Sequence, residues 1–258
     1  MKQIPNLLTL LNLFFGCLAV ISVLQNGIGI SVVSSADGTL AQLIEMPERI
    51  WMASLFIGLA GVADFLDGFA ARLFNNDSAL GKELDSLADV VSFGVAPGLI
   101  LYQFLRVSFM NQTNAIDVSI LWLLPAMLIP CAGAYRLARF NIDNSQRHSF
   151  RGVPIPAVGL LIASFPLIYW NADNESIVSL LLNKWVLYAI ILLLSYLMIS
   201  NLSLMAFKFK DLTFKHNKPR FALLLIAVIS AFFLHWLSIP VIFIFYIILS
   251  LAFKNKIS

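Results

Sequence analysis

Long apolar runs constrain this sequence more than any other feature. A helix that crosses the roughly 30 Å hydrocarbon core of a bilayer needs about 20 consecutive apolar residues, and somewhat fewer where flanking side chains reach the interface. Eight stretches meet this requirement, and we predict one membrane span for each. They lie near residues 7–25 (with a loose continuation to 33), 50–73, 86–105, 119–140, 155–171, 185–206, 221–237 and 239–253.

The composition agrees with a membrane location. Hydrophobic residues make up 60% of the 258 residues and charged residues only 12%, whereas a soluble domain has about 25% charged residues. The sequence therefore predicts an all-α, polytopic helical bundle that forms a single membrane domain over 1–258. We expect a core of about 4–206 and an additional helix pair at about 221–253. Ser238-Ile239-Pro240 separates that pair, which could be a tight hairpin or one broken element.

The basic residues orient the predicted helices. With eight spans, fourteen of the 17 Lys and Arg residues fall on the side that holds both termini and the loops at 74–85, 141–154 and 207–220. Because cytoplasmic loops are enriched in Lys and Arg, we predict that both termini are cytoplasmic. Merging the last two spans would move the basic C-terminus to the opposite side, so the charge distribution favours eight.

Four aspartates stand out in this apolar sequence. Asp64 and Asp67 are three residues apart and Asp85 and Asp89 are four apart, so each pair lies on one face of a helix. Asp64 precedes Arg72 by eight residues, and we place Arg72 at the cytoplasmic rim of the membrane. At 1.5 Å per residue, Asp64 then lies roughly 12 Å below that rim. An ionised Asp inside a membrane helix costs about 2.5–3.5 kcal/mol, and less near the interface.

The nearby cations, Arg72 and Lys82, cannot neutralise four carboxylates, so we predict that divalent metal ions supply the missing charge. Ligand sets made only of oxygen favour Mg²⁺ or Mn²⁺ over Zn²⁺. Carboxylates, metal ions and an adjacent Arg are a common arrangement for phosphate chemistry, in which a carboxylate can accept the proton of an attacking hydroxyl. The residues themselves thus predict metal-dependent phosphate chemistry on a substrate with a lipid end.

The segment from Asp64 to Asp89 resembles the motif of the CDP-alcohol phosphatidyltransferases. It matches that motif at all eight fixed positions across 26 residues, which are Asp64, Asp67, Gly68, Ala71, Arg72, Gly81, Asp85 and Asp89. Members of the family move a phosphatidyl group from CDP-diacylglycerol to an alcohol and release CMP. They are helical membrane enzymes with a six-helix core and are often homodimeric.

The resemblance assigns roles to these positions. It implies that the four aspartates, Asp64, Asp67, Asp85 and Asp89, are ligands of two divalent ions. It also implies that Asp85 and Asp89 are catalytic, with Asp89 as the general base. Gly68, Ala71 and Arg72 would lie against the cytidine diphosphate, and Gly81 would permit its close approach.

Three further stretches resemble the branch of this family whose acceptor alcohol is serine. They are residues 4–16, 85–98, and 135–141 together with 150–157, so that the resemblance covers roughly residues 4–170. Within the first stretch, Asn6 and Thr9 either contact CDP-diacylglycerol or only cap and pack the helix.

Three arginines carry a second prediction. Arg136 and Arg139 lie three apart on one helix face, and Arg151 follows after a loop. The enrichment of Lys and Arg at the cytoplasmic face would explain one such arginine. Three together indicate a pocket for the serine carboxylate or a phosphate.

The resemblance therefore implies an enzyme of the inner cell membrane that transfers the phosphatidyl group of CDP-diacylglycerol to L-serine, and the charge distribution predicts that its active site faces the cytoplasm. The products would be phosphatidylserine and CMP. We expect surrounding membrane lipids, a homodimer and no nucleic-acid partner. One alternative is a sister enzyme that uses glycerol 3-phosphate or inositol. The other is a cation- or proton-coupled transporter, which the lack of an internal repeat of the acidic pattern disfavours.

Overall fold

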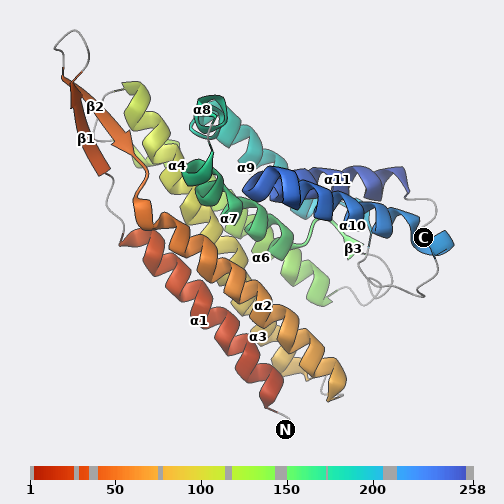
Figure 1. The fold of residues 1–258 in the computed structure, drawn as a ribbon. Helices are drawn as coiled ribbons and strands as arrows, with labels where there is room; N and C mark the ends of the chain where they lie inside the picture. Colours follow the sequence, from red (N-terminus) through yellow and green to blue (C-terminus); the bar gives the residue numbers. More distant parts are fainter. Residues whose placement is uncertain are drawn as a thin grey trace.

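The chain folds into a bundle of helices (Figure 1). The computed structural model describes residues 3–25, 29–34, 40–74, 78–113, 118–142, 150–172, 174–205 and 214–253. The longer helices are α1 (Ile4–Leu24), α2 (Trp51–Leu73), α3 (Ala79–Asp89), α4 (Ala96–Thr113), α6 (Leu128–Ile142), α7 (Ile155–Asn171), α9 (Lys184–Ile199), α10 (Phe214–Leu234) and α11 (Ser238–Ala252). The shorter elements are α5 (Ile120–Leu123), α8 (Glu175–Leu181) and the strands β1 (Gly29–Ser34), β2 (Leu40–Glu45), β3 (Phe150–Arg151) and β4 (Ser203–Leu204).

Several of these helices are long and apolar enough to cross a membrane, as expected for a multi-pass membrane protein. Within the described residues five helical stretches qualify: Ile4–Leu24, Trp51–Leu73, Ala79–Asn111, Ile120–Ile142 and Pro219–Ala252. Helices α8 and α9 together are also long and apolar enough, but they are bent by 61° relative to each other. If this pair is one span, the described residues contain six candidate spans. The predicted count of eight and the cytoplasmic position of the termini stay predictions.

The C-terminal helices α10 and α11 pack side by side (Figure 1). A short 3-10 turn, His235–Leu237, joins them, and His235 has a φ of 47° there. Of the two arrangements left open for this region, the structure has the hairpin.

Several predicted helix boundaries were wrong, and the span expected at 86–105 belongs to a helical stretch that runs from Ala79 to Thr113. α1 ends at Leu24, and residues 29–34 form strand β1, which pairs antiparallel with β2, instead of continuing the helix to 33. Gly29 disfavours a helix, while Ile30, Val32 and Val33 favour a strand. The predicted span 185–206 ends as a helix at Ile199, and β4 follows and pairs with β3. In the part of the chain that the structure describes, the regular elements are therefore helices and two short antiparallel strand pairs.

Helix α3 continues into α4 through a π-helical turn, Val90–Val95. Helix α1 lies against this turn with a buried stripe at helical spacing, which comprises Pro5, Thr9, Asn12, Gly16, Ala19 and Val23. A Cβ atom added to Gly16 would lie 2.9 Å from Ser92 Cα, so only glycine permits this approach. The close packing fixes α1 beside α2 and α3 at the end of the bundle that carries the N-terminus (Figure 1).

Aromatic side chains gather where α4 ends and α9 begins. The Phe109 ring lies 6.0 Å from that of Trp122, and Tyr188 donates its hydroxyl proton to the Trp122 carbonyl oxygen at 2.7 Å. The Lys184 ammonium lies 4.9 Å from the centre of the Phe109 ring. Aromatic residues with a polar end are typical of the membrane–water interface.

Candidate functional site

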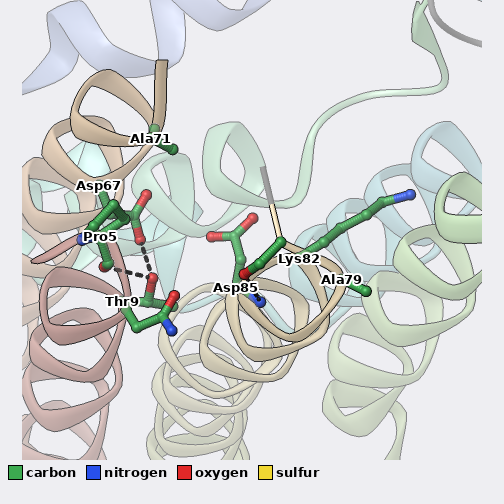
Figure 2. Close-up of a pocket in the computed structure, with 11 residues that line it drawn as sticks. Pro5, Thr9, Asp67, Ala71, Ala79, Lys82 and Asp85 are labelled. Atoms are coloured by element: carbon green, nitrogen blue, oxygen red, sulfur yellow. Dashed lines mark hydrogen bonds between the residues drawn. The ribbon is translucent and has the colours of Figure 1, made fainter. Parts of the chain in front are cut away.

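Three of the four aspartates, two from α2 and one from α3, come together beside α1. Asp64, Asp67 and Asp85 each offer a carboxylate oxygen, and these oxygens lie within 4.8 Å of one another. The Asp67 side chain is 6% exposed, and the other two are half-buried. Figure 2 shows Asp67 on α2 and Asp85 on α3 at the same pocket.

The fourth aspartate, Asp89, lies one helical turn beyond Asp85 on α3 and is only 5% exposed. It is outside the group of three, but it is close enough to Asp64 and Asp85 for their charges to interact. Asn12 of α1 donates its Nδ2 hydrogen to Asp89 Oδ1 at 3.2 Å. The structure thus gives Asp89 a fixed position next to the cluster.

Helix α1 also holds Asp67. The Thr9 hydroxyl donates to Asp67 Oδ2 at 2.6 Å and lies 3.1 Å from the Pro5 carbonyl oxygen (Figure 2). Thr9 and Asn12 are three residues apart, so one face of α1 contacts an aspartate from each of the other two helices.

A cavity of about 420 Å³ opens beside the carboxylates. The residues that line it come from α1, from the end of α2 and from the start of α3: Pro5, Asn6, Thr9, Asp67, Gly68, Ala71, Ser78, Ala79, Gly81, Lys82 and Asp85. Five residues predicted to bind CDP-diacylglycerol are in this set, namely Asn6, Thr9, Gly68, Ala71 and Gly81. A Cβ atom at Gly68 would have nothing within 4 Å among the described residues, so the backbone there is open to a ligand.

Gly81 has a different environment from Gly68. Ser78 caps the start of α3 by accepting the Gly81 N–H at 3.0 Å. A Cβ atom on Gly81 would lie 3.0 Å from Ser78 Oγ and 3.1 Å from Asn6 Oδ1. α1 and the helix cap therefore lie close to Gly81 at the wall of the cavity, and the predicted approach of the cytidine diphosphate to Gly81 stays a prediction.

The nearby cations bind backbone carbonyl groups. Arg72 is exposed and donates its Nε hydrogen to the Gly68 carbonyl oxygen at 2.8 Å. Lys82 donates to the Asn141 carbonyl oxygen at 3.2 Å, and its ammonium lies 5.7 Å from the centre of the Phe140 ring. Arg72 is next to the cavity but is not among the residues that line it.

A divalent cation fits this set of donors. Asp85 Oδ1 is buried and has no hydrogen-bond partner among the described residues, and burial of such a group is costly without a partner. Three converging carboxylates provide the all-oxygen coordination that hard divalent cations prefer. We infer that Asp64, Asp67 and Asp85 can hold such an ion.

The three predicted anion-binding arginines differ in their surroundings. Arg136 of α6 is 9% exposed, and its Nε has no hydrogen-bond partner within the described residues. It is near enough to Asp89 for their charges to interact. Arg139, one turn later, donates to the Ile199 carbonyl oxygen at 3.3 Å and to the Asn201 side chain.

Arg151 is described only in its backbone, which pairs with Ser203 in the β3–β4 ladder. Its predicted side-chain role lies outside what the structure describes, and the role of Arg139 in anion binding stays a prediction.

Two residues of the site, Asn12 and Ser92, were not among those predicted from the sequence. Asn12 binds the Asp89 carboxylate, and Ser92 in the π-helical turn donates to the Asn12 carbonyl oxygen at 3.0 Å. One signal for Asn12 was available: it is a polar residue in an apolar helix, on the same face as Thr9.

Comparisons with known proteins agree with this geometry. The sequence model of the family described as CDP-alcohol phosphatidyltransferase matches residues 2–198. The match covers α1 to α9 and ends before α10 and α11.

Several curated proteins are similar over the same region. The CDP-diacylglycerol–serine O-phosphatidyltransferase of Helicobacter pylori (strain ATCC 700392 / 26695) is 37% identical over 177 residues, which are 68% of each chain. The protein of the same name from Bacillus subtilis (strain 168) is 32% identical over 169 residues, which are 66% of this chain and 78% of the relative. The archaetidylserine synthase of Methanothermobacter thermautotrophicus is 34% identical over 140 residues, which are 54% of this chain and 56% of the relative.

Proposed function

The chain belongs to the CDP-alcohol phosphatidyltransferase family, and we propose that it transfers the phosphatidyl group of CDP-diacylglycerol to L-serine. The products are phosphatidylserine and CMP. Relatives from bacteria and an archaeon whose names specify serine as the acceptor support this choice of alcohol.

One observation carries the proposal: three buried or half-buried carboxylates converge beside a cavity of about 420 Å³. A cluster of this kind is costly in a membrane protein, and so its presence indicates function. The small residues Gly68 and Ala71 leave one wall open for a bulky, charged headgroup.

We place the cytidine diphosphate of the substrate in this cavity. Asn6 lines the wall formed by α1, and Gly68 and Ala71, which the motif places against the cytidine diphosphate, line the wall formed by α2. Arg72 would contact the diphosphate by turning from the Gly68 carbonyl group, since its side chain is exposed. The acyl chains of the lipid would remain in the bilayer.

The carboxylates Asp64, Asp67, Asp85 and Asp89 would hold Mg²⁺ or Mn²⁺, in two sites according to the motif. A bound divalent cation supplies positive charge that stabilises the negative charge developing on the phosphate groups. Thr9 orients Asp67 through its hydroxyl, and Asp85 contributes an oxygen that has no partner among the described residues.

Asp89 would act as the general base. The serine hydroxyl gives its proton to the Asp89 carboxylate as its oxygen forms a bond to the phosphatidyl phosphorus. The bond between that phosphorus and the CMP oxygen breaks, and CMP leaves. Asn12 holds one Asp89 oxygen through a hydrogen bond, which leaves the second oxygen for the proton.

The acceptor would lie between Asp89 and Arg136. The buried Arg136 guanidinium presents donors in a planar fork that matches a carboxylate, and its Nε has no hydrogen-bond partner among the described residues. An anionic acceptor bound there has its hydroxyl close to the base. Arg139 and Arg151 complete the basic surroundings in this proposal.

We further propose that the site opens to the cytoplasmic face of the inner cell membrane. The positive-inside distribution of Lys and Arg supports this orientation. The homodimer implied by the family stays a prediction.

An acceptor assay on the purified protein tests the proposal. CMP release from CDP-diacylglycerol is measured with L-serine, glycerol 3-phosphate or inositol, each with Mg²⁺ or Mn²⁺. We expect release with serine and little with the other alcohols. Release with glycerol 3-phosphate but not with serine would refute the choice of acceptor, and ion flux without any CMP release would favour a transporter.

A further inference from the structure

Polar side chains join α3 to the last turn of α6. Asn141 donates its Nδ2 hydrogen to Ser86 Oγ at 2.9 Å. Lys82 donates to the Asn141 carbonyl oxygen at 3.2 Å, and its ammonium lies 5.7 Å from the centre of the Phe140 ring. Lys82 and Ser86 are four residues apart and so lie on one face of α3. We call Lys82, Ser86 and Asn141 the α3–α6 brace.

The bond between Asn141 and Ser86 has a fixed direction. The Ser86 hydroxyl donates to the Lys82 carbonyl oxygen at 3.1 Å, within α3. Its one proton is therefore used, and its oxygen accepts from the Asn141 amide. Both side chains are half-buried, which partly shields the bond from water. The bond thus requires a donor at position 141 and an acceptor at position 86.

The α3–α6 brace connects the two helices that carry the proposed acceptor site. On α3, Ser86 precedes the proposed base, Asp89, by three residues. On α6, Asn141 follows Arg136 by five residues. Figure 2 shows the Lys82 side chain extending away from the carboxylate of Asp85, so its ammonium group serves the brace. The distance between the two helices is therefore set close to the base and the arginine.

The two helices are attached differently to the rest of the bundle. On the side away from the brace, α3 packs against α1, where Asn12 donates to Asp89 at 3.2 Å. The end of α6 is bound by Arg139, which donates to the Ile199 carbonyl oxygen and to the Asn201 side chain. Without the brace, α1 would still hold the carboxylates of α3, whereas the end of α6 would follow the segment at 199–201 instead of α3.

We propose that Asn141 is a positioning residue that sets the distance between α6 and α3, and thereby places Arg136 to bind the anionic group of the acceptor alcohol. The brace then determines acceptor binding and leaves the metal site unchanged. This inference rests on the proposed function, because it assumes that Arg136 contacts the acceptor and that Asp89 is the base.

Asn141→Ala tests the proposal because it removes the donor of the bond. We expect the KM for serine to rise about three- to tenfold, the size that loss of one neutral hydrogen bond produces. The kcat, the KM for CDP-diacylglycerol and the affinity for Mn²⁺ should stay within about twofold of wild type, since α1 holds the aspartates of α3. Steady-state kinetics and titration of Mn²⁺ by electron paramagnetic resonance measure these quantities.

Asn171→Ala is the matched control. Asn171 is the last residue of α7, and its Nδ2 donates to the Leu167 carbonyl oxygen of the same helix at 2.8 Å. The same amide is removed near the end of a helix, but no bond between helices is lost. We expect the KM for serine to be unchanged in this variant, and thermal unfolding of each variant measures the structural cost separately.

A double-mutant cycle identifies the bond itself. Ser86→Ala removes the acceptor and should raise the KM for serine as Asn141→Ala does, and the double variant should raise it no further. If Asn141→Ala does not fold, Ser86→Ala is measured with the same expectations. Multiplicative effects of the two changes would overturn the proposal. So would a serine KM within twofold of wild type in both single variants, or an equal loss in Mn²⁺ affinity.

The wild-type protein separates this inference from the proposed function. If it releases CMP with glycerol 3-phosphate and not with serine, the choice of serine fails. The same variants are then measured with glycerol 3-phosphate, and a selective rise in its KM still supports the role of Asn141. Release with uncharged inositol alone, or with no alcohol, would overturn the inference, because no anionic acceptor would then need Arg136.

Discussion

The α1–α3 region and the α10–α11 hairpin are both apolar, but they use buried polar side chains differently. In the hairpin the buried side chains bond to backbone groups: Ser230 and Ser238 donate to the carbonyl groups three residues earlier, and Tyr246 and Ser250 bond to the backbone of Met205. In α1–α3 the bonds connect separate helices, as between Asn12 and Asp89.

This difference distinguishes buried polar side chains that only support the fold from those that serve a function. A serine that bonds to its own helix satisfies its hydroxyl at little cost and needs no ligand. The α1–α3 region instead gathers carboxylates and leaves Asp85 Oδ1 and Asn12 Oδ1 without a partner within the described residues. Of these two regions, as far as the structure describes them, only α1–α3 has carboxylate and amide oxygens that need a ligand as partner. The family motif lies in this region and not in the hairpin.

The largest effect should come from the proposed base. Asp89→Asn keeps the size of the side chain and removes the proton acceptor, so kcat should fall about 10²- to 10⁴-fold while CDP-diacylglycerol still binds. Turnover measures the fall in kcat, and equilibrium binding of CDP-diacylglycerol measures whether the substrate still binds. Glu83→Gln, an exposed carboxylate on the same helix, is the control and should be silent. Near-normal turnover in Asp89→Asn would remove Asp89 from the mechanism.

Asn12→Ala should have the next largest effect. The change removes the donor that orients Asp89, and a hydrogen bond to a charged group is worth about 1.5–3 kcal/mol, or about 10- to 100-fold in kcat. Ser22→Ala serves for comparison, because Ser22 donates to the Leu18 carbonyl group of α1 itself. If both variants lose activity equally, the bond between α1 and α3 has no special role.

Gly16→Ala tests the packing of α1 and should reduce stability. Its Cβ atom would meet the Ser92 side chain and lie 2.9 Å from Ser92 Cα, and overpacking of this kind costs about 1–3 kcal/mol. Thermal unfolding in detergent measures the loss. Gly58→Ala in α2 is matched to it, because an added Cβ there meets nothing within 4 Å among the described residues. Equal midpoints for the two variants would contradict the close approach.

The smallest effect is expected in the hairpin. Ser230→Ala removes a hydroxyl that bonds only within α10 in the described contacts, and activity should stay within about twofold of wild type, since such a bond contributes little. The serine-dependent release of CMP is the readout. A loss as large as that of Asn12→Ala would remove the contrast between the two regions.

Much of the site could be predicted from residue spacing. The intervals between Asp64, Asp67, Asp85 and Asp89 put each pair on one helix face, and the structure brings three of the four together. The positions of Gly68 and Ala71 at the cavity followed from the motif.

The remaining contacts depend on how the helices rotate against one another. The bond between Asn12 and Asp89 joins residues 77 apart in the chain, and spacing within one helix cannot predict it. The π-helical turn at Val90–Val95 has no pattern in the sequence that marks it, and it places Ser92 against α1. The strand at Gly29–Ser34 escaped prediction because its apolar residues extended the pattern of the first span.

Binding of Mn²⁺ to the purified protein tests most directly whether the clustered carboxylates hold a divalent cation. The free ion is titrated by electron paramagnetic resonance with wild-type protein, with Asp67→Asn/Asp85→Asn and with Glu83→Gln. We expect wild type and Glu83→Gln to bind alike and the double variant to lose at least about tenfold in affinity, because two of the three converging carboxylates are neutral. Unchanged Mn²⁺ binding in the double variant, with CMP release that persists in EDTA, would contradict the account.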